Sequence, residues 1–104
     1  MGINSRADLA RADSVMRSRI NEELMLGGVT IIDPATTFIS FGTKIGSDSV
    51  IYPFTVIEKD VKIGKHCSVG PLCRLRPGTR LFDNVSVGNF IEISRSILRS
   101  GARA

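Results

Sequence analysis

The stretch that decides the fold is Ile63-Gly64-Lys65-His66-Cys67-Ser68 followed by Val69-Gly70-Pro71-Leu72-Cys73-Arg74. Each six-residue unit begins with an aliphatic residue and has a small residue at its fifth position. The same pattern extends in both directions, from residue 39 to residue 98. The first position of successive units is always aliphatic: Ile39, Ile45, Ile51, Ile57, Ile63, Val69, Leu75, Leu81, Val87 and Ile93. A fixed repeat of this kind predicts a solenoid, in which each unit packs only on its neighbours.

The place of a residue in the unit predicts where its side chain lies. Three units, each one short strand and one corner, are expected to close a triangular coil of about 18 residues, with coils about 4.8 Å apart. First positions then fill the interior, and glycine, asparagine or aspartate near the corners tolerates a positive φ. Fifth positions also point inward: Thr43, Ser49, Thr55, Val61, Cys67, Cys73, Thr79, Val85, Ile91 and Ile97. We therefore predict a mainly β fold, a parallel β-helix over residues 29–104.

The repeat is irregular near both ends of the coil. If the period of six continued to the C-terminus, Arg99 and Arg103 would point into the core. Shortening one unit by a residue instead places Leu98 at a first position and Ala102 at a fifth position, and we expect that arrangement. Residues 29–34 precede the strict period and are expected to cap the open end of the coil. The last unit has no cap of its own, which indicates either a covering chain or a longer natural protein.

Residues 1–28 are expected to form a linker helix that leads into the coil. Ser5, followed three residues later by Asp8, is typical of a helix start with a capping side chain and an acid in the first turn. Gly27 and Gly28 supply the stop, since glycine takes the left-handed conformation at low cost. Apolar residues recur at spacings of three and four: Leu9, Ala12, Met16, Ile20 and Leu24. This stripe predicts an amphipathic helix that packs along one face on a neighbour.

The composition excludes several classes of function. The chain has 104 residues, a net charge of +4 and no apolar run near the ~20 residues that cross a bilayer, and no secretory signal, so a cytoplasmic protein is expected. Tyr52 is the only tyrosine and tryptophan is absent, so no stacking platform for nucleic acid is indicated. His66 is the only histidine, which excludes a three-histidine metal site within one subunit. Cys67 and Cys73 fit neither a disulfide framework nor a zinc site and are interpreted as small core residues.

Four segments carry a resemblance to a known family. They are residues 70–78 (Gly-Pro-Leu-Cys-Arg-Leu-Arg-Pro-Gly), 87–92 (Val-Gly-Asn-Phe-Ile-Glu), 2–6 (Gly-Ile-Asn-Ser-Arg) and 28–34 (Gly-Val-Thr-Ile-Ile-Asp-Pro). The chain resembles the linker helix and the first part of the acetyltransferase domain of the bacterial bifunctional N-acetylglucosamine-1-phosphate uridylyltransferase/glucosamine-1-phosphate N-acetyltransferase family. The resemblance implies a left-handed coil, as in other hexapeptide-repeat proteins, and association as a parallel homotrimer.

The resemblance also implies an activity. Members of the family transfer acetyl from acetyl-CoA to the amine of glucosamine 1-phosphate, and they make UDP-N-acetylglucosamine for cell-wall peptidoglycan precursors in the cytoplasm. Their catalytic base is a histidine just beyond a segment that residues 101–104 match, so it would fall just past Ala104. We therefore expect no catalytic residue in this chain and no activity from it alone. Acetyl-CoA and Mg²⁺ belong to the intact enzyme, and this chain alone is expected to hold neither.

The resemblance assigns a substrate phosphate to Arg76, the arginine of the Arg-Pro-Gly segment. A guanidinium suits this role because it binds phosphate bidentately; the alternative interpretation is an ion pair with Glu58, one coil earlier in the same column. Where the family has a second, phosphate-binding lysine, this chain has Ser94, followed by Arg95, so these two residues are the candidate second contacts. Asn4 matches an asparagine that helps to hold Mg²⁺ in the intact uridylyltransferase; alternatively, it belongs only to the helix N-cap.

Two other functions remain open at this stage. One is a non-catalytic β-helix scaffold that trimerises. The other is a sugar nucleotidylyltransferase relative with a different acceptor, which Ser94 favours because a hydroxyl group brings no positive charge to the phosphate. A nucleic-acid binder is the weakest interpretation of the scattered basic residues.

Overall fold

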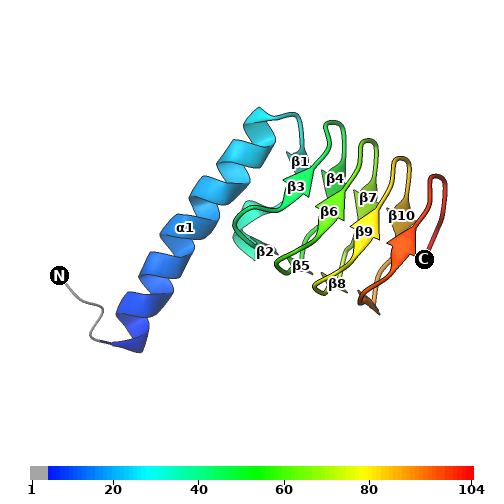
Figure 1. Ribbon diagram of the computed structural model, residues 1–104. Helices are drawn as coiled ribbons and strands as arrows, with labels where there is room; N and C mark the ends of the chain where they lie inside the picture. The colour runs from blue at the N-terminus through cyan, green and yellow to red at the C-terminus, as the bar shows by residue number, and fades with distance from the viewer. Residues whose placement is uncertain (1–4) are drawn as a thin grey trace.

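The computed structural model describes residues 5–104 as one helix followed by a coil of short strands (Figure 1). The helix, α1, spans Arg6–Leu26, and a short 3₁₀ helix spans Pro34–Thr36. The strands are β1 Thr30–Ile31, β2 Thr37–Ile39, β3 Lys44–Ile45, β4 Val50–Ile51, β5 Thr55–Ile57, β6 Lys62–Ile63, β7 Ser68–Val69, β8 Cys73–Leu75, β9 Arg80–Leu81, β10 Ser86–Val87, β11 Ile91–Ile93 and β12 Ile97–Leu98. In the described residues, no helix has the length and apolarity that spanning a membrane requires.

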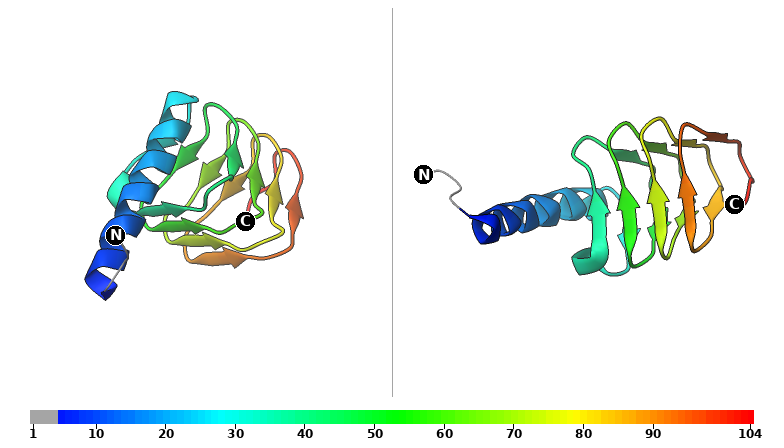
Figure 2. Two further views of the ribbon diagram at one scale, coloured as in Figure 1. Left: turned by 60° about the vertical axis from the view of Figure 1, so that its left-hand side comes forward. Right: turned by 90° about the horizontal axis from the view of Figure 1, so that it is seen from below.

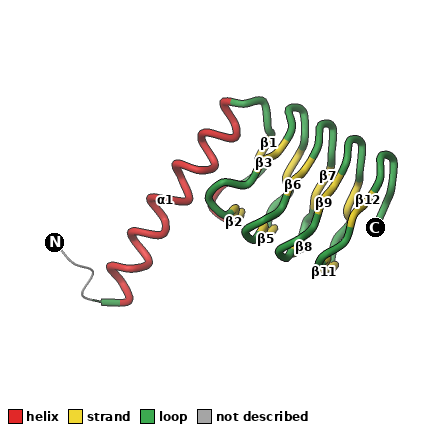
Figure 3. Tube along the Cα trace, viewed as in Figure 1, coloured by secondary structure: helices red, strands yellow, loops and turns green. Residues whose placement is uncertain are grey.

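The strands form three parallel sheets, which we call walls A, B and C. Wall A contains β1, β4, β7 and β10, wall B contains β2, β5, β8 and β11, and wall C contains β3, β6, β9 and β12. Successive strands of the chain therefore belong to different walls, and each coil lies on the one before it (Figures 2 and 3). In wall B, Thr37 pairs with Thr55, and Thr55 with Cys73, so three six-residue units separate the partners. The predicted parallel β-helix is confirmed; its left-handed coiling stays a prediction.

The interior of the coil consists of the first and fifth positions of the repeat, as the sequence predicts. Of the first-position residues only Ile45 keeps intermediate exposure, and the others are buried. The buried fifth-position residues are Ser49, Thr55, Val61, Cys67, Cys73, Thr79 and Val85. The two cysteines are free and belong to this core, which confirms their interpretation. Burial raises the pKa of the Cys73 thiol to about 11, so this thiol stays protonated at neutral pH.

The fourth position of each unit turns the corner, and its backbone is left-handed. The glycines and small polar residues there are expected in this conformation: Gly42, Asp48, Asp60, Gly78 and Asn84. The corner between walls A and B differs, because it carries Phe54, Leu72 and Phe90, with φ of 59°, 54° and 55°. The sequence pattern did not predict apolar residues with a positive φ.

One unit near the end of the coil is a residue short, as expected. In wall C, Ile97 pairs with Arg80 and Leu98 with Leu81, a spacing one position smaller than that between β10 and β7 in wall A or between β11 and β8 in wall B. Leu98 and Ala102 pack against the core, and neither Arg99 nor Arg103 is buried. The assignment of Ile97 to an inward fifth position is wrong: its side chain is exposed, because the shortened unit moves it to the outer face of wall C.

The coil begins earlier than the strict repeat does. Thr30 and Ile31 pair with Val50 and Ile51 of wall A, and Val29 and Ile31 are buried in the core. Residues 29–34 are therefore largely part of the first coil, and the expectation that they cap its open end is wrong. Ile32 is exposed.

The C-terminal half of α1 covers this end of the coil instead (Figure 1). Ile20 and Leu24 pack against the core, and Asn21, between them, is 1% exposed. The Asn21 side-chain amide donates to the carbonyls of Pro34 and Thr37, at 3.2 and 3.3 Å. These hydrogen bonds attach the helix to the turn that starts wall B.

The start of α1 is as predicted, but its apolar stripe is only half covered. The Ser5 hydroxyl accepts a hydrogen bond from the Asp8 N–H at 3.1 Å, and Gly28, after the last turn, has φ 96°. Leu9 and Met16 are exposed, because the N-terminal half of the helix extends past the coil (Figure 1). The prediction of packing along the whole stripe is wrong for this half.

Candidate functional site

The candidate phosphate-binding residues meet at the corner between walls B and C. Arg76 and Pro77 follow β8, and Ser94 and Arg95 follow β11 in the next coil. Because β8 and β11 pair in register, Ser94 lies above Arg76, and the Arg76 N–H donates to the Ile93 carbonyl at 2.7 Å. These four side chains line an open hollow of about 340 Å³. The structure thus brings together the three residues that the sequence selects: Arg76, Ser94 and Arg95.

The shortened unit determines where Arg95 lies. With one residue missing, Arg95 stands opposite Gly78 of the coil below, and it takes the left-handed corner conformation with φ 49°. A Cβ on Gly78 would lie only 3.2 Å from the Arg95 Cγ. The stem of Arg95 therefore packs over the glycine, beside Arg76. A standard six-residue unit would place the arginine one position away from this corner.

Glu58 is held mainly by Arg74 and only loosely by Arg76. The Arg74 Nε donates to Glu58 Oε2 at 2.7 Å, whereas the Arg76 Nε lies 3.8 Å from the same oxygen. The hydrogen bond from Arg74 holds the pKa of Glu58 below its ordinary value, and the same contact raises the pKa of Arg74. Arg76 is about half exposed, so most of its guanidinium is free to bind an anion.

Arg74 is the important residue that the sequence interpretation missed. It lies on the outer face of wall B between Glu58 and Glu92, and its Nη1 is 3.8 Å from Glu92 Oε2. Its strand position directly opposite Glu92 of the next coil was a usable signal. The expected ion pair of Arg76 with Glu58 exists at long range, but Arg74 makes the stronger contact.

The hollow can bind and orient an anion, but no acid–base residue lines it. His66 turns a different corner, between β6 and β7, where its Nε2 lies 3.9 Å from Asp48 Oδ2 on an exposed surface. Residues 5–104 contain no cluster of three or more His, Cys, Asp or Glu side chains that could hold a metal ion. Asn4, the candidate Mg²⁺ ligand, lies outside the described residues.

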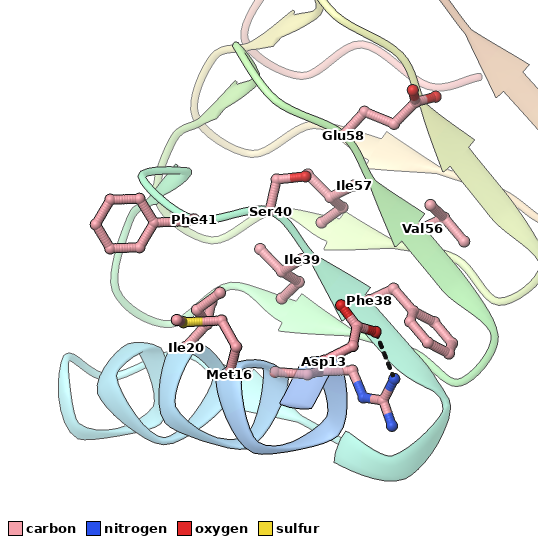
Figure 4. A pocket seen from close by; sticks show the side chains of 11 residues that line it. Asp13, Met16, Ile20, Phe38, Ile39, Ser40, Phe41, Val56, Ile57 and Glu58 are labelled. Carbon is pink, nitrogen blue, oxygen red and sulfur yellow. Dashed lines mark ion pairs between the residues drawn. The ribbon is translucent and has the colours of Figure 1, made fainter. Parts of the chain in front are cut away.

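A second hollow, of about 260 Å³, lies between α1 and wall B (Figure 4). Met16 and Ile20 face Phe38 and Ile39 across it. The Arg17 guanidinium sits 4.3 Å from the centre of the Phe38 ring and 3.8 Å from Asp13. The side chains of Arg17 and Asp13, which line this hollow, are thus engaged with neighbours. The hollow therefore has the character of a packing surface between α1 and wall B.

Comparison with known proteins shows which sequences this chain is similar to. Residues 42–77 match the family described as "Bacterial transferase hexapeptide (six repeats)". Over 138 aligned residues, which include all of this chain, it is 36% identical to the "Bifunctional protein GlmU" of Geotalea uraniireducens. It is 39% identical to the protein of that name from Thermosipho africanus and 37% identical to that from Shouchella clausii, in both cases over 99% of this chain. This chain is similar to one segment of proteins named GlmU.

The relationship concerns one segment of the GlmU relatives. The chain spans 30% of the length of each of these relatives. The stretch aligned with the Geotalea protein is 138 residues long, whereas this chain has 104, and the difference is close to the length of two coils. The aligned segment of the Geotalea protein is therefore longer than this chain.

Proposed function

We propose that this chain is the linker helix and part of the acetyltransferase domain of a GlmU-type enzyme. In this proposal the enzyme transfers acetyl from acetyl-CoA to the amine of glucosamine 1-phosphate, and it also makes UDP-N-acetylglucosamine for peptidoglycan precursors in the bacterial cytoplasm. One observation carries the proposal: Arg76 and Arg95 converge on one hollow, in a chain that aligns with GlmU proteins over its whole length.

The role of this chain is to bind the acceptor. The guanidinium of Arg76 takes the sugar phosphate in charge-assisted hydrogen bonds. Ser94 adds a hydroxyl donor, and Arg95 supplies the second positive charge at the same hollow. Fixing the phosphate orients the sugar, so that its amine is presented to a base and an acetyl thioester elsewhere in the enzyme. Acetyl-CoA and Mg²⁺ serve the intact enzyme, and we assign neither of them to residues 5–104.

Calorimetric titration of the 104-residue chain with glucosamine 1-phosphate tests this role. Arg76→Ala should weaken binding about tenfold or more, because it removes charge-assisted hydrogen bonds. Arg95→Ala should weaken it less. The control is Arg80→Ala, which removes an exposed arginine of wall C that lines a different hollow. Equal affinity of the Arg76→Ala variant and the wild type, or no binding by either, would contradict the assignment.

The acceptor sugar is tested separately, because Ser94 departs from the family's lysine. Glucose 1-phosphate titrated beside glucosamine 1-phosphate distinguishes the two interpretations. We expect tighter binding of the amino sugar. A preference for glucose 1-phosphate would favour the alternative, a nucleotidylyltransferase relative with another acceptor.

We further propose that the chain forms a homotrimer and that the 104 residues alone do not transfer acetyl groups. The only histidine, His66, is not among the residues that line the phosphate hollow. Light scattering at micromolar concentration should give three times the monomer mass of 11.3 kDa. Thiol release from acetyl-CoA in the presence of glucosamine 1-phosphate should be undetectable. A trimer that binds no sugar phosphate would favour the alternative of a non-catalytic scaffold.

A further inference from the structure

Two successive turns of the chain are tied together at the corner between walls B and C, beside the phosphate hollow. The lower turn, residues 76–79, ends in Thr79, which is 1% exposed. The Thr79 hydroxyl lies 2.7 Å from the Arg76 carbonyl oxygen and 3.1 Å from the Ile93 carbonyl oxygen of the coil above. The Arg76 N–H donates to the same Ile93 carbonyl, so these contacts hold the upper turn, residues 94–96, over the lower one.

Arg95 of the upper turn crosses the lower turn at Gly78. A Cβ on Gly78 would lie 3.2 Å from Arg95 Cγ and 3.4 Å from Arg95 Cα. Carbon atoms in contact prefer about 3.5–4.0 Å, so a side chain at this position would push Arg95 away from the corner. Arg95 lines the phosphate hollow with Arg76, and within residues 5–104 it forms no ion pair with an acidic side chain. Its guanidinium is therefore available to a ligand.

The backbone conformation alone does not explain the glycine at this corner. Gly42, Asp60 and Gly78 occupy the same corner of three successive coils, since the strands on either side of them pair at a constant spacing. All three are left-handed, with φ of 83°, 59° and 88°, and Asp60 carries a side chain in this conformation. A Cβ on Gly42 would meet nothing within 4 Å. Of the two glycines, only Gly78 has a neighbour that a side chain would displace.

We propose that Gly78 is a positioning residue of the phosphate site: because it has no side chain, Arg95 lies across the turn and its guanidinium joins that of Arg76 in one hollow. The shortened unit completes this arrangement, since it places Arg95 over Gly78 instead of over Pro77. The inference rests on the proposed function and names what gives the hollow its second cation. The ligand class is a terminal phosphate, whose oxygens accept hydrogen bonds from both guanidinium groups and from the Ser94 hydroxyl.

A pair of matched glycine substitutions separates this role from backbone strain. Gly78→Ala and Gly42→Ala both put a methyl group on a left-handed corner residue, so both should lower the melting temperature. Gly78→Ala should also weaken the binding of glucosamine 1-phosphate about threefold in a calorimetric titration, because it displaces Arg95. Gly42→Ala should bind the sugar phosphate as the wild type does.

Two further measurements report on Arg95 itself. The double variant Gly78→Ala/Arg95→Ala should bind no more weakly than Arg95→Ala, because there is no longer an arginine side chain to displace. In the free protein, the NMR signal of the Arg95 Nε–Hε group should shift in Gly78→Ala and stay in place in Gly42→Ala. A purely structural role of Gly78 would instead give additive losses of affinity and leave this signal unchanged.

Inserting one glycine after Arg95 tests the contribution of the shortened unit. The insertion gives this unit its standard length, so the new glycine takes the place over Gly78 and Arg95 moves over Pro77. Glycine tolerates the corner conformation, and the coil should fold. The affinity for glucosamine 1-phosphate should fall about as far as in Arg95→Ala. Adding Ser94→Lys to the insertion should restore it, because residue 94 lies above Arg76 and lines the same hollow.

The outcomes distinguish the positioning role from the proposed function. Loss of affinity in Arg76→Ala supports the phosphate site whatever Gly78 does. If Gly78→Ala then binds as tightly as Gly42→Ala, or the insertion keeps the wild-type affinity, the positioning role is overturned. If Gly78→Ala does not fold, the insertion and its Ser94→Lys rescue decide. Equal affinity of Arg76→Ala and the wild type overturns the proposed function and this inference with it.

Discussion

The interior of the coil and the apolar stripe of α1 are covered to different extents. Ile51, Val69 and Val85 in the coil have no accessible surface, whereas Leu9 and Met16 on the helix are exposed. The coil covers itself, because the repeat that creates an apolar side chain also creates the coil that lies on it. The helix depends on a surface from another part of the molecule, and only its last turns reach one. An apolar period therefore predicts burial reliably only where the same period supplies the partner.

The largest expected effect on the free energy of unfolding comes from truncating a buried side chain in the interior of the coil. Leu75 is fully buried in the column of Ile39, Ile57 and Ile93, so Leu75→Ala should lower the free energy of unfolding by about 2–5 kcal/mol. Urea unfolding followed by circular dichroism, at fixed protein concentration, measures it. Phe41→Ala, which removes an exposed aromatic side chain at the B–C corner, serves as control. A loss below about 1 kcal/mol would show that the coil does not depend on its interior as the burial implies.

The junction between helix and coil should be the next most sensitive. Asn21→Ala removes both hydrogen bonds to the turn before wall B and leaves the Pro34 and Thr37 carbonyls with fewer donors. We expect a loss of about 1–3 kcal/mol in the free energy of unfolding. Glu22→Ala, one residue further and exposed, should change it by less than about 0.5 kcal/mol. Equal effects of the two substitutions would mean that Asn21 does not join the two regions.

Within α1, the two halves of the stripe should respond differently. Ile20→Ala removes a side chain packed on the core and should lower the free energy of unfolding by about 1–2 kcal/mol. Leu9→Ala changes an exposed residue and should cost less than about 0.5 kcal/mol. The same urea titrations measure both. If Leu9→Ala proves as destabilising as Ile20→Ala, another chain or segment covers the free half of the helix.

The smallest expected effect is on the outer face of the coil and depends on pH. Because the hydrogen bond from Arg74 lowers the pKa of Glu58, the ionised carboxylate stabilises the fold above its ordinary pKa of 4.5. This contribution should disappear as the pH falls below that value through the lowered pKa. Glu58→Gln should therefore reduce stability at pH 7 and make the acid limb of the stability profile flatter. In 1 M NaCl the difference from the wild type should shrink, since exposed pairs are screened. A salt-independent difference would contradict an electrostatic origin.

Much of the coil could be predicted because the position of a residue in the six-residue unit determines whether its side chain is buried. The period of six identified the buried first and fifth positions, and the inward-pointing Arg99 and Arg103 revealed the shortened unit. The same stacking rule placed Ser94 above Arg76 at the candidate phosphate site. The position of a residue in the repeat determines whether its side chain points inward and which residue it stacks on, so the walls and the candidate site could be predicted from the period.

The remaining features lack that periodicity. Asn21 is a polar residue of α1, and it is buried because its side-chain amide donates hydrogen bonds to the carbonyls of Pro34 and Thr37. Thr30 and Ile31 join wall A although the hexapeptide pattern starts only later, since a strand can pair without repeating. The Arg74 contact to Glu58 depends on side-chain conformation between coils. These features are set by specific tertiary contacts, which cannot be predicted from a single sequence.

The shortened coil has a consequence for how the chain finds one alignment. A solenoid of identical coils has no origin, because sliding one part by a whole coil brings equivalent side chains into equivalent places. The short unit makes one part of the coil distinct: the segment after Ile93 pairs with the coil below it at a spacing one residue smaller, and pairing at the ordinary spacing would turn Arg99 and Arg103 toward the core. The short unit thus fixes how the last coil aligns with the coil below it. The short unit lies beside Arg76 and Arg95, so the part of the coil whose alignment is most constrained is also the part where a misalignment would disturb ligand binding.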